Sequence, residues 1–329
     1  MKNKILTGLL LVLIGGWGSL SAQSAGSNYS RQVNTLIGTK GVGLTSGYLY
    51  PGATYPYGMV QFTPSYFSKR SGFVINQLSG GGCEHMGNFP TFPVKGKLKM
   101  SPDNILNYRI NISEEKGHAG YYEAMVQEDI KAKLTVTERT GMASYEYPTD
   151  QQYGTVIIGG GISATPIEQA AIVITAPNKC EGYAEGGNFC GLRTPYKVYF
   201  VAEFDTDALE SGTWKRNELK PNTTFAEGEY SGVYFTFDVN KKKNIQYKIG
   251  VSYVSVENAR ENLKTENSGW DFLQIQNQAE SKWNHYLGMI EVEGTNPDRT
   301  IQFYYNRTFV PFPSLFAAFN RPRATSFPL

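Results

Sequence analysis

Residues 130–138 read IKAKLTVTE and alternate apolar with polar side chains. Successive side chains of an extended chain point to opposite faces, so this alternation predicts a strand with one buried face. Similar segments, rich in β-branched and aromatic residues and bounded by Gly, Pro, Asn or Asp, recur at residues 59–63, 107–113, 143–147, 153–159, 170–175, 196–204, 233–239 and 247–256. Their spacing predicts an all-β protein with an antiparallel β-sandwich or barrel.

The composition agrees with a folded protein and argues against a nucleic-acid partner. Of the 329 residues 40% are hydrophobic, 13% are aromatic and 18% are charged, which excludes intrinsic disorder. Lys and Arg number 31 against 29 Asp and Glu. Two of the lysines lie in a segment that we expect to be removed, which leaves no net charge to hold a nucleic acid.

Residues 1–22 have the organisation of a signal peptide. Lys2 and Lys4 form a basic start, residues 5–14 are mostly apolar, and Ser-Leu-Ser-Ala at residues 19–22 is a small-residue cleavage site. The apolar run is too short to span a bilayer. We therefore predict a secreted or periplasmic protein that begins at or near Gln23 and has no membrane span.

Three cysteines are an odd number, so at least one is unpaired within the chain. Cys180 and Cys190 flank a glycine-rich stretch that could fold its ends together, and we predict a disulfide between them. Cys83 is then left over, and we expect it to be a small buried residue.

The pattern changes from strands to helices after Val256. Residues 257–268 contain good helix formers, and residues 270–290 place apolar side chains near one helical face. Two helices should therefore follow the sheets. At this spacing Trp270 and Trp283 are expected in the core, although tryptophan can also stack on sugars.

A second change comes at Ile301. Residues 301–329 contain three Arg and no acidic residue, many Phe, and prolines that interrupt any helix. We therefore divide the chain into a signal peptide (1–22), a sandwich domain (23–256), linker helices (257–300) and a Pro/Phe-rich tail (301–329).

The densest group of polar residues is GGGCEHMGNFPTFP at residues 80–93. Its glycines would let a ligand approach the backbone, its polar side chains could hydrogen-bond sugar hydroxyls, and an aromatic ring could support a sugar face. The candidate substrate-binding residues are Gly82, Cys83, Glu84, His85, Asn88 and Phe89. A structured but inert loop is the alternative. We predict no metal ligand, because none of the three histidines has a metal-ligand spacing. We also assign no catalytic residue, because the sequence does not place any two carboxylates at the separation that a glycosidase needs.

Several stretches resemble one enzyme family. VNTLIGT at residues 33–39 and PGATYPYGMVQ at residues 51–61 are similar to the opening of glycoside hydrolase family 92, the exported exo-α-mannosidases. GVSYVSVENARENL at residues 250–263 and the stretch from Trp283 to Tyr304 resemble the passage from its sandwich to its helices.

The resemblance implies an N-terminal β-sandwich followed by an (α/α)₆ barrel and calcium-assisted, inverting hydrolysis of mannose-rich glycans. The family's catalytic acid and base lie in the barrel, so no catalytic residue can be transferred to this sequence. The sandwich would support the active site, and loops such as residues 80–93 would wall the mannose pocket. No Asp/Asn cluster here has an EF-hand-like spacing, so we expect the calcium ligands in the missing barrel domain.

The sequence departs from the family after Tyr304, where residues 305–329 replace the expected barrel helices. We interpret this departure as a frameshift that leaves a fragment, which we expect to be inactive alone. The alternative is a free carbohydrate-binding or interaction module.

Overall fold

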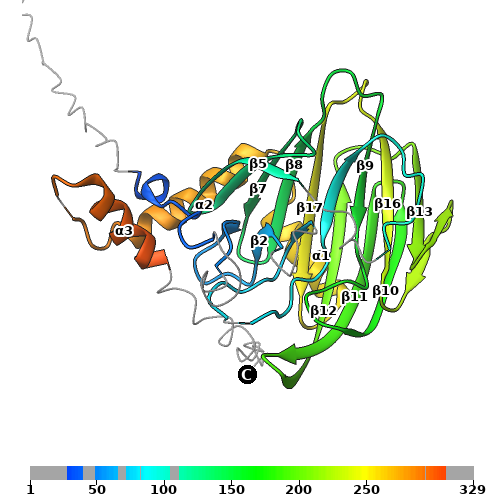
Figure 1. Cartoon of the computed structure of the whole chain (residues 1–329), viewed down its shortest axis with the longest axis horizontal. Helices are drawn as coiled ribbons and strands as arrows, with labels where there is room; N and C mark the ends of the chain where they lie inside the picture. Colours follow the sequence, from blue (N-terminus) through cyan, green and yellow to red (C-terminus); the bar gives the residue numbers. More distant parts are fainter. Residues whose placement is uncertain are drawn as a thin grey trace, which may run out of the picture.

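The computed structural model describes residues 28–39, 49–65, 72–81, 83–103, 111–292 and 294–308. These residues form two antiparallel sheets, packed as a β-sandwich with helices beside it (Figure 1). The first sheet has the order β1 (Ala53–Thr54), β2 (Gln61–Pro64), β3 (Phe73–Val74), β4 (Thr91–Lys95), β9 (Tyr153–Ile158), β16 (Ser231–Asp238), β13 (Glu210–Lys215) and β14 (Glu218–Pro221). The second has the order β15 (Phe225–Glu227), β10 (Ile167–Ala176), β11 (Lys179–Phe189), β12 (Leu192–Phe204), β17 (Asn244–Ser252), β8 (Thr140–Glu146), β7 (Ile130–Val136), β6 (Tyr121–Val126) and β5 (Ile112–His118). The prediction of an all-β sandwich is confirmed.

Strand β7 shows how the alternation produces the sandwich. Ile130, Ala132 and Leu134 are each 0% exposed, whereas Lys131 and Lys133 lie on the opposite face and are partly exposed. Full burial of a side chain such as Leu134 stabilises the fold by about 2 kcal/mol. The alternation of apolar and polar residues therefore identifies the face of the strand that is buried between the two sheets.

Aromatic rings join the inner faces of the two sheets. The Phe204 ring of β12 lies 5.0 Å from both the Phe235 and the Phe237 ring of β16, and 5.3 Å from the Tyr247 ring of β17. All four side chains are at most 1% exposed. Edge and tilted contacts at such distances are favourable in addition to the area that they bury.

The other predicted strands also correspond to strands of the structure. The overlapping elements are β2, β5, β8, β9, β10, β12, β16 and β17. For the segment predicted at residues 107–113, β5 begins at Ile112, and residues 104–110 lie outside the described residues.

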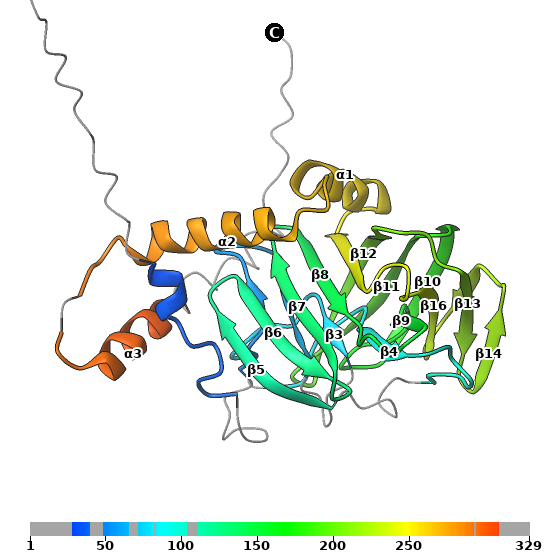
Figure 2. The ribbon, with the colours of Figure 1, turned by 90° about the horizontal axis from the view of Figure 1, so that it is seen from above.

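Helices α1 (Val256–Glu266) and α2 (Phe272–Leu287) confirm the two predicted helices. Each begins at a side-chain cap: the Ser255 hydroxyl accepts a hydrogen bond from the Asn258 amide, and the Asp271 carboxylate accepts one from the Gln274 amide. Helix α1 packs on β17 and β12, and α2 lies along β6 to β8 (Figure 2). Trp283 of α2 is 1% exposed, as predicted. The same prediction is wrong for Trp270, which precedes α2 and is partly exposed.

A third helix, α3 (Pro297–Thr308), continues through the residue where we placed the start of the tail. The expectation that no helical periodicity survives beyond Ile301 is therefore wrong for residues 301–308. Tyr304 and Tyr305 are buried in a second core cluster, which also contains Val33 and Trp283. Residues 309–329 lie outside the described part.

A buried lysine binds the connection between α1 and α2. Lys248 of β17 donates hydrogen bonds from Nζ to the carbonyl oxygens of residues 267–269, at 2.9, 3.2 and 3.5 Å. Its ammonium lies 3.6 Å from the Glu203 carboxylate and 4.3 Å from the centre of the Trp270 ring. Because helices end with unpaired carbonyls, a cation at this position satisfies the end of α1 and fixes the start of α2.

The predicted Cys180–Cys190 disulfide is wrong. Cys190 is bonded to Cys83, with 5.4 Å between the Cα atoms, and Cys180 is a free, fully buried cysteine. The glycine-rich stretch does not fold back, because it is the extended strand β11, Lys179–Phe189. At about 3.3 Å per residue, Cys180 and Cys190 lie roughly 30 Å apart. Cys83 is likewise not the unpaired buried residue that we expected.

Candidate functional site

The candidate stretch at residues 80–93 ends in β4, which begins at Thr91. The loop before it, residues 78–90, belongs to the connection from β3 and has an unusual backbone. Gly80 and Gly87 have φ values of 78° and 72°, and the non-glycine residues Met86 and Phe89 have φ values of 48° and 56°. A left-handed residue that is not glycine costs about 1–2 kcal/mol, so the surrounding contacts must impose this path.

Buried hydrogen bonds fix this backbone path at the base of the loop. The Asn88 amide donates to the Asn76 side-chain oxygen at 2.7 Å, and Asn88 Oδ1 accepts from Asn76 Nδ2 at 2.9 Å. The hydroxyl of Tyr196, on β12, donates to the same Oδ1 at 2.8 Å. Burial raises the pKa of Tyr196 to about 12. Asn88 is 0% exposed, so its oxygen joins the loop to the second sheet and does not face solvent.

Phe89 is also directed into the protein. Its side chain is 1% exposed, and its ring lies 4.2 Å from the Phe200 ring of β12. The structure thus places Asn88 and Phe89 in the core beneath the loop, where they support its shape.

His85 forms the middle of the loop. Its ring is 0% exposed, lies 4.7 Å from the Phe189 ring, and has Nδ1 2.7 Å from the Cys83 carbonyl oxygen. A carbonyl can only accept, so Nδ1 carries the proton. Burial lowers the pKa of His85, partly offset by the hydrogen bond to the Cys83 carbonyl. The histidine is therefore a neutral residue around which the loop folds.

Gly81 makes this arrangement possible. A Cβ atom at Gly81 would lie 2.4 Å from Cε1 of the His85 ring. The chain can wrap the imidazole only where no side chain intervenes.

The outer part of the loop carries Cys83 and Glu84. Cys83 forms the disulfide, and Glu84 is exposed. Gly82, the remaining predicted residue, lies outside the described residues. Of the six candidates Glu84 is the one whose side chain the described structure presents to solvent.

The sequence analysis missed the segment across from this loop, the tip of the β11–β12 hairpin. Phe189 pairs with Leu192 across a two-residue turn, Cys190-Gly191, whose φ values are 52° and 82°. Positive φ at both positions is typical of a type I′ hairpin turn. The signal in the sequence was a turn residue next to Cys190 between two strand-like segments.

No group of three or more His, Cys, Asp or Glu side chains among the described residues could hold a metal ion. No helix among these residues is long and apolar enough to cross a membrane.

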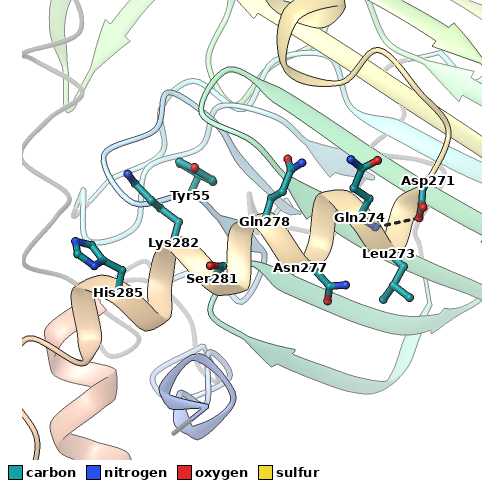
Figure 3. A pocket seen from close by; sticks show the side chains of 9 residues that line it. All are labelled: Tyr55, Asp271, Leu273, Gln274, Asn277, Gln278, Ser281, Lys282 and His285. Carbon is teal, nitrogen blue, oxygen red and sulfur yellow. Dashed lines mark hydrogen bonds between the residues drawn. The ribbon is translucent and has the colours of Figure 1, made fainter. Parts of the chain in front are cut away.

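An open groove of about 730 Å³ lies beside α2, lined by Tyr55, Leu273 and polar side chains of the helix and its cap. Figure 3 shows Gln274, Gln278 and Lys282 on the same side of the helix as Tyr55, and Leu273 and Asn277 on another side. A row of polar side chains at four-residue spacing is typical of a solvated helix face. We therefore retain the loop at residues 78–90 as the candidate site.

Family models match most of the chain. The model of the glycosyl hydrolase family 92 N-terminal domain matches residues 32–252, and that of the family 92 catalytic domain matches residues 258–311. The second match extends beyond Tyr304, the residue after which we placed the departure from the family.

Known proteins are similar over the same region. An uncharacterized secreted glycosidase of Arthroderma benhamiae is 25% identical over 85% of this chain and 40% of its own length. A family GH92 alpha-mannosidase of Bacteroides thetaiotaomicron has a TM-score of 0.73 at 23% identity, covering 85% of this chain and 41% of that protein. A family GH92 inverting mannosidase from the same organism gives 0.72 at 23% identity, covering 84% and 38%. The chain thus spans about two fifths of these relatives.

Proposed function

Because the chain belongs to glycosyl hydrolase family 92, we propose that it forms the N-terminal sandwich of an α-mannosidase acting on mannose-rich glycans. In this proposal the sandwich supports and walls the active site, and the catalytic acid and base come from a helical barrel. Inversion needs one carboxyl group to protonate the leaving oxygen and a second to activate water on the opposite face of the sugar.

The observation that carries the proposal is the loop at residues 78–90. A buried histidine, a buried asparagine and a disulfide hold it in a fixed shape, and Glu84 is presented at its surface. A carboxylate accepts hydrogen bonds from neighbouring sugar hydroxyls without needing to be protonated. We assign Glu84 to substrate binding, with His85, Asn88 and Phe89 as residues that shape the loop.

The aromatic residues favour this role over that of a free carbohydrate-binding module. The largest fully buried side chains are Trp214, Trp283, Tyr122, Tyr145, Tyr147, Tyr247, Tyr304, Phe62, Phe73, Phe89, Phe92 and Phe200. Rings in the core cannot stack on a glycan, so packing accounts for these twelve aromatic residues.

Export and calcium belong to the proposal as well. A disulfide that closes a 107-residue separation suits an oxidising compartment, which supports secretion or a periplasmic location. Calcium would be held by the barrel and would assist the inversion. Titrating calcium into the exported protein should then leave its melting temperature unchanged; a calcium-dependent rise would place a site within this chain.

The main test compares the exported protein, residues 23–329, with the same sandwich extended by the helical barrel of a family member. Both are assayed with calcium on an aryl α-mannoside and on mannose-rich glycans. We expect mannose release from the extended protein only, because losing both catalytic carboxyl groups removes several orders of magnitude in rate. Comparable turnover by both would overturn the proposal and place the catalytic carboxylates within this chain.

Glu84→Gln in the extended protein tests the loop. Loss of a charged acceptor should lower kcat/KM about tenfold or more, equivalent to about 1.5–3 kcal/mol. The matched control is Glu218→Gln, at an exposed glutamate on the edge strand β14, whose side chain is 72% exposed. Equal activity of both variants would remove Glu84 from the substrate site.

A further inference from the structure

The Cys83–Cys190 disulfide joins two segments that the sheets alone do not hold together. It closes a sequence separation of 107 residues between the loop at residues 78–90 and the turn of the β11–β12 hairpin. The His85–Phe189 ring contact lies directly beside it. The bridge and the ring contact therefore form one small junction.

The hairpin tip has little support of its own. β10 pairs with β11 only as far as Gly186, and β17 pairs with β12 only from Tyr199 onward. Residues 187–195 thus extend past both neighbouring strands, and a register shift between Gly186 and Asn188 separates them from the body of the sheet. A two-stranded ribbon without further strands is marginally stable in water.

The outer part of the loop depends on the same junction. Its two sides are anchored in the sandwich: the Ser79 amide donates to Gln61 Oε1 at 3.1 Å, and the Ala164 amide donates to the Met86 carbonyl at 2.8 Å. Between these anchors lie Gly80 and Gly81, which add backbone freedom. Glu84 directly follows the bridged cysteine, so the disulfide restrains the backbone from which its side chain projects.

We propose that Cys83 and Cys190 are a positioning pair, which locks the loop and the hairpin tip into one rigid wall and thereby places Glu84 for glycan binding. The last clause rests on the proposed function; the coupling of the two segments does not. Neither cysteine contacts the sugar in this proposal, so each acts through the segments that it joins.

The test breaks the bridge from each side separately, as Cys83→Ala and as Cys190→Ala, and measures hydrogen exchange along the oxidised full chain. We expect each variant to speed exchange at least tenfold in both segments, residues 79–85 and residues 187–195, while β8 and β17 stay protected. Cys180→Ala, at the buried free cysteine, is the control and should change neither segment. Faster exchange confined to the mutated segment, or in neither segment, would overturn the coupling.

The consequence for binding is measured on the sandwich extended by the family barrel. Both bridge variants should raise KM about tenfold with a smaller change in kcat, and combining either with Glu84→Gln should add little further. An unchanged KM in both variants would overturn the positioning role. If the parent protein has no mannosidase activity, the proposed function fails, and the exchange experiment still decides whether the disulfide couples the two segments.

Discussion

Replacing Lys248 by Met tests how the sandwich fixes the helices that follow it. The side chain of Lys248 is 4% exposed, and its ammonium is the donor to the carbonyls of residues 267–269. Burial lowers the pKa of Lys248, and the neighbouring Glu203 carboxylate opposes that shift. Methionine keeps most of the apolar stem but supplies no donor.

The expected loss of folding free energy follows from the contacts that Lys248→Met removes. Each hydrogen bond to a charged group contributes about 1.5–3 kcal/mol. Lys248 makes three of them, whereas Glu203 keeps its ion pair with Lys179 after the substitution. Burial of the charge itself is unfavourable and offsets part of this, so we expect the free energy of unfolding to fall by about 3 kcal/mol. For a domain of this size the melting temperature should fall by roughly 6–10 °C.

The assay is urea unfolding of residues 23–329, followed by far-UV circular dichroism, together with a thermal scan. The control is Lys241→Met. The side chain of Lys241 is 83% exposed, and its ion-pair partner is Asp238, three residues earlier in the chain. The control should change stability by less than about 0.5 kcal/mol. If Lys248→Met is as stable as the parent, the cost of burying the ammonium equals what its contacts contribute, and the role assigned to Lys248 is refuted.

Two further substitutions test the site and the packing of the helices. Because the pKa of buried His85 is lowered, the unfolded chain binds the proton of this histidine more tightly than the folded protein does. The free energy of unfolding should therefore fall as the pH drops below about 6.5, by at most about 1.4 kcal/mol per pH unit. It should level off below the pKa of His85 in the folded protein. His85→Gln should reduce the dependence of the unfolding free energy on pH, measured by urea titrations between pH 5 and pH 8. His285→Gln, on the exposed face of α2, is the control and should leave this dependence unchanged. If His85→Gln also leaves it unchanged, His85 is not the buried neutral histidine described above. Gly250→Ala should destabilise the protein by about 1–3 kcal/mol, because the new Cβ would lie 2.6 Å from a backbone oxygen of α1. Gly269→Ala, with nothing within 4 Å of its Cβ, is the control, and equal stability of the two variants would argue against close helix–sheet packing.

The sequence by itself determined the local structure. Alternation in residues 130–138 gives β7, and the capping residues Ser255 and Asp271 begin the two helices, because such signals act over a few neighbouring residues. The family resemblance could also be recognised from short stretches. The end of the helical region could not: α3 is held by packing of Tyr304 and Tyr305 against residues near the start of the chain.

Only the tertiary structure decided which cysteines meet and which candidate residues face solvent. Cys180 lies near the start of the extended strand β11 and Cys190 directly after its end, whereas Cys83 reaches Cys190 across a separation of 107 residues. Asn88 belongs to the same polar loop as Glu84, yet its side chain is buried. Its Oδ1 accepts a hydrogen bond from the hydroxyl of Tyr196, which lies in the second sheet. Composition identifies side chains that could bind a sugar. Whether they face a ligand or the core depends on strands that come together only when the two sheets pack.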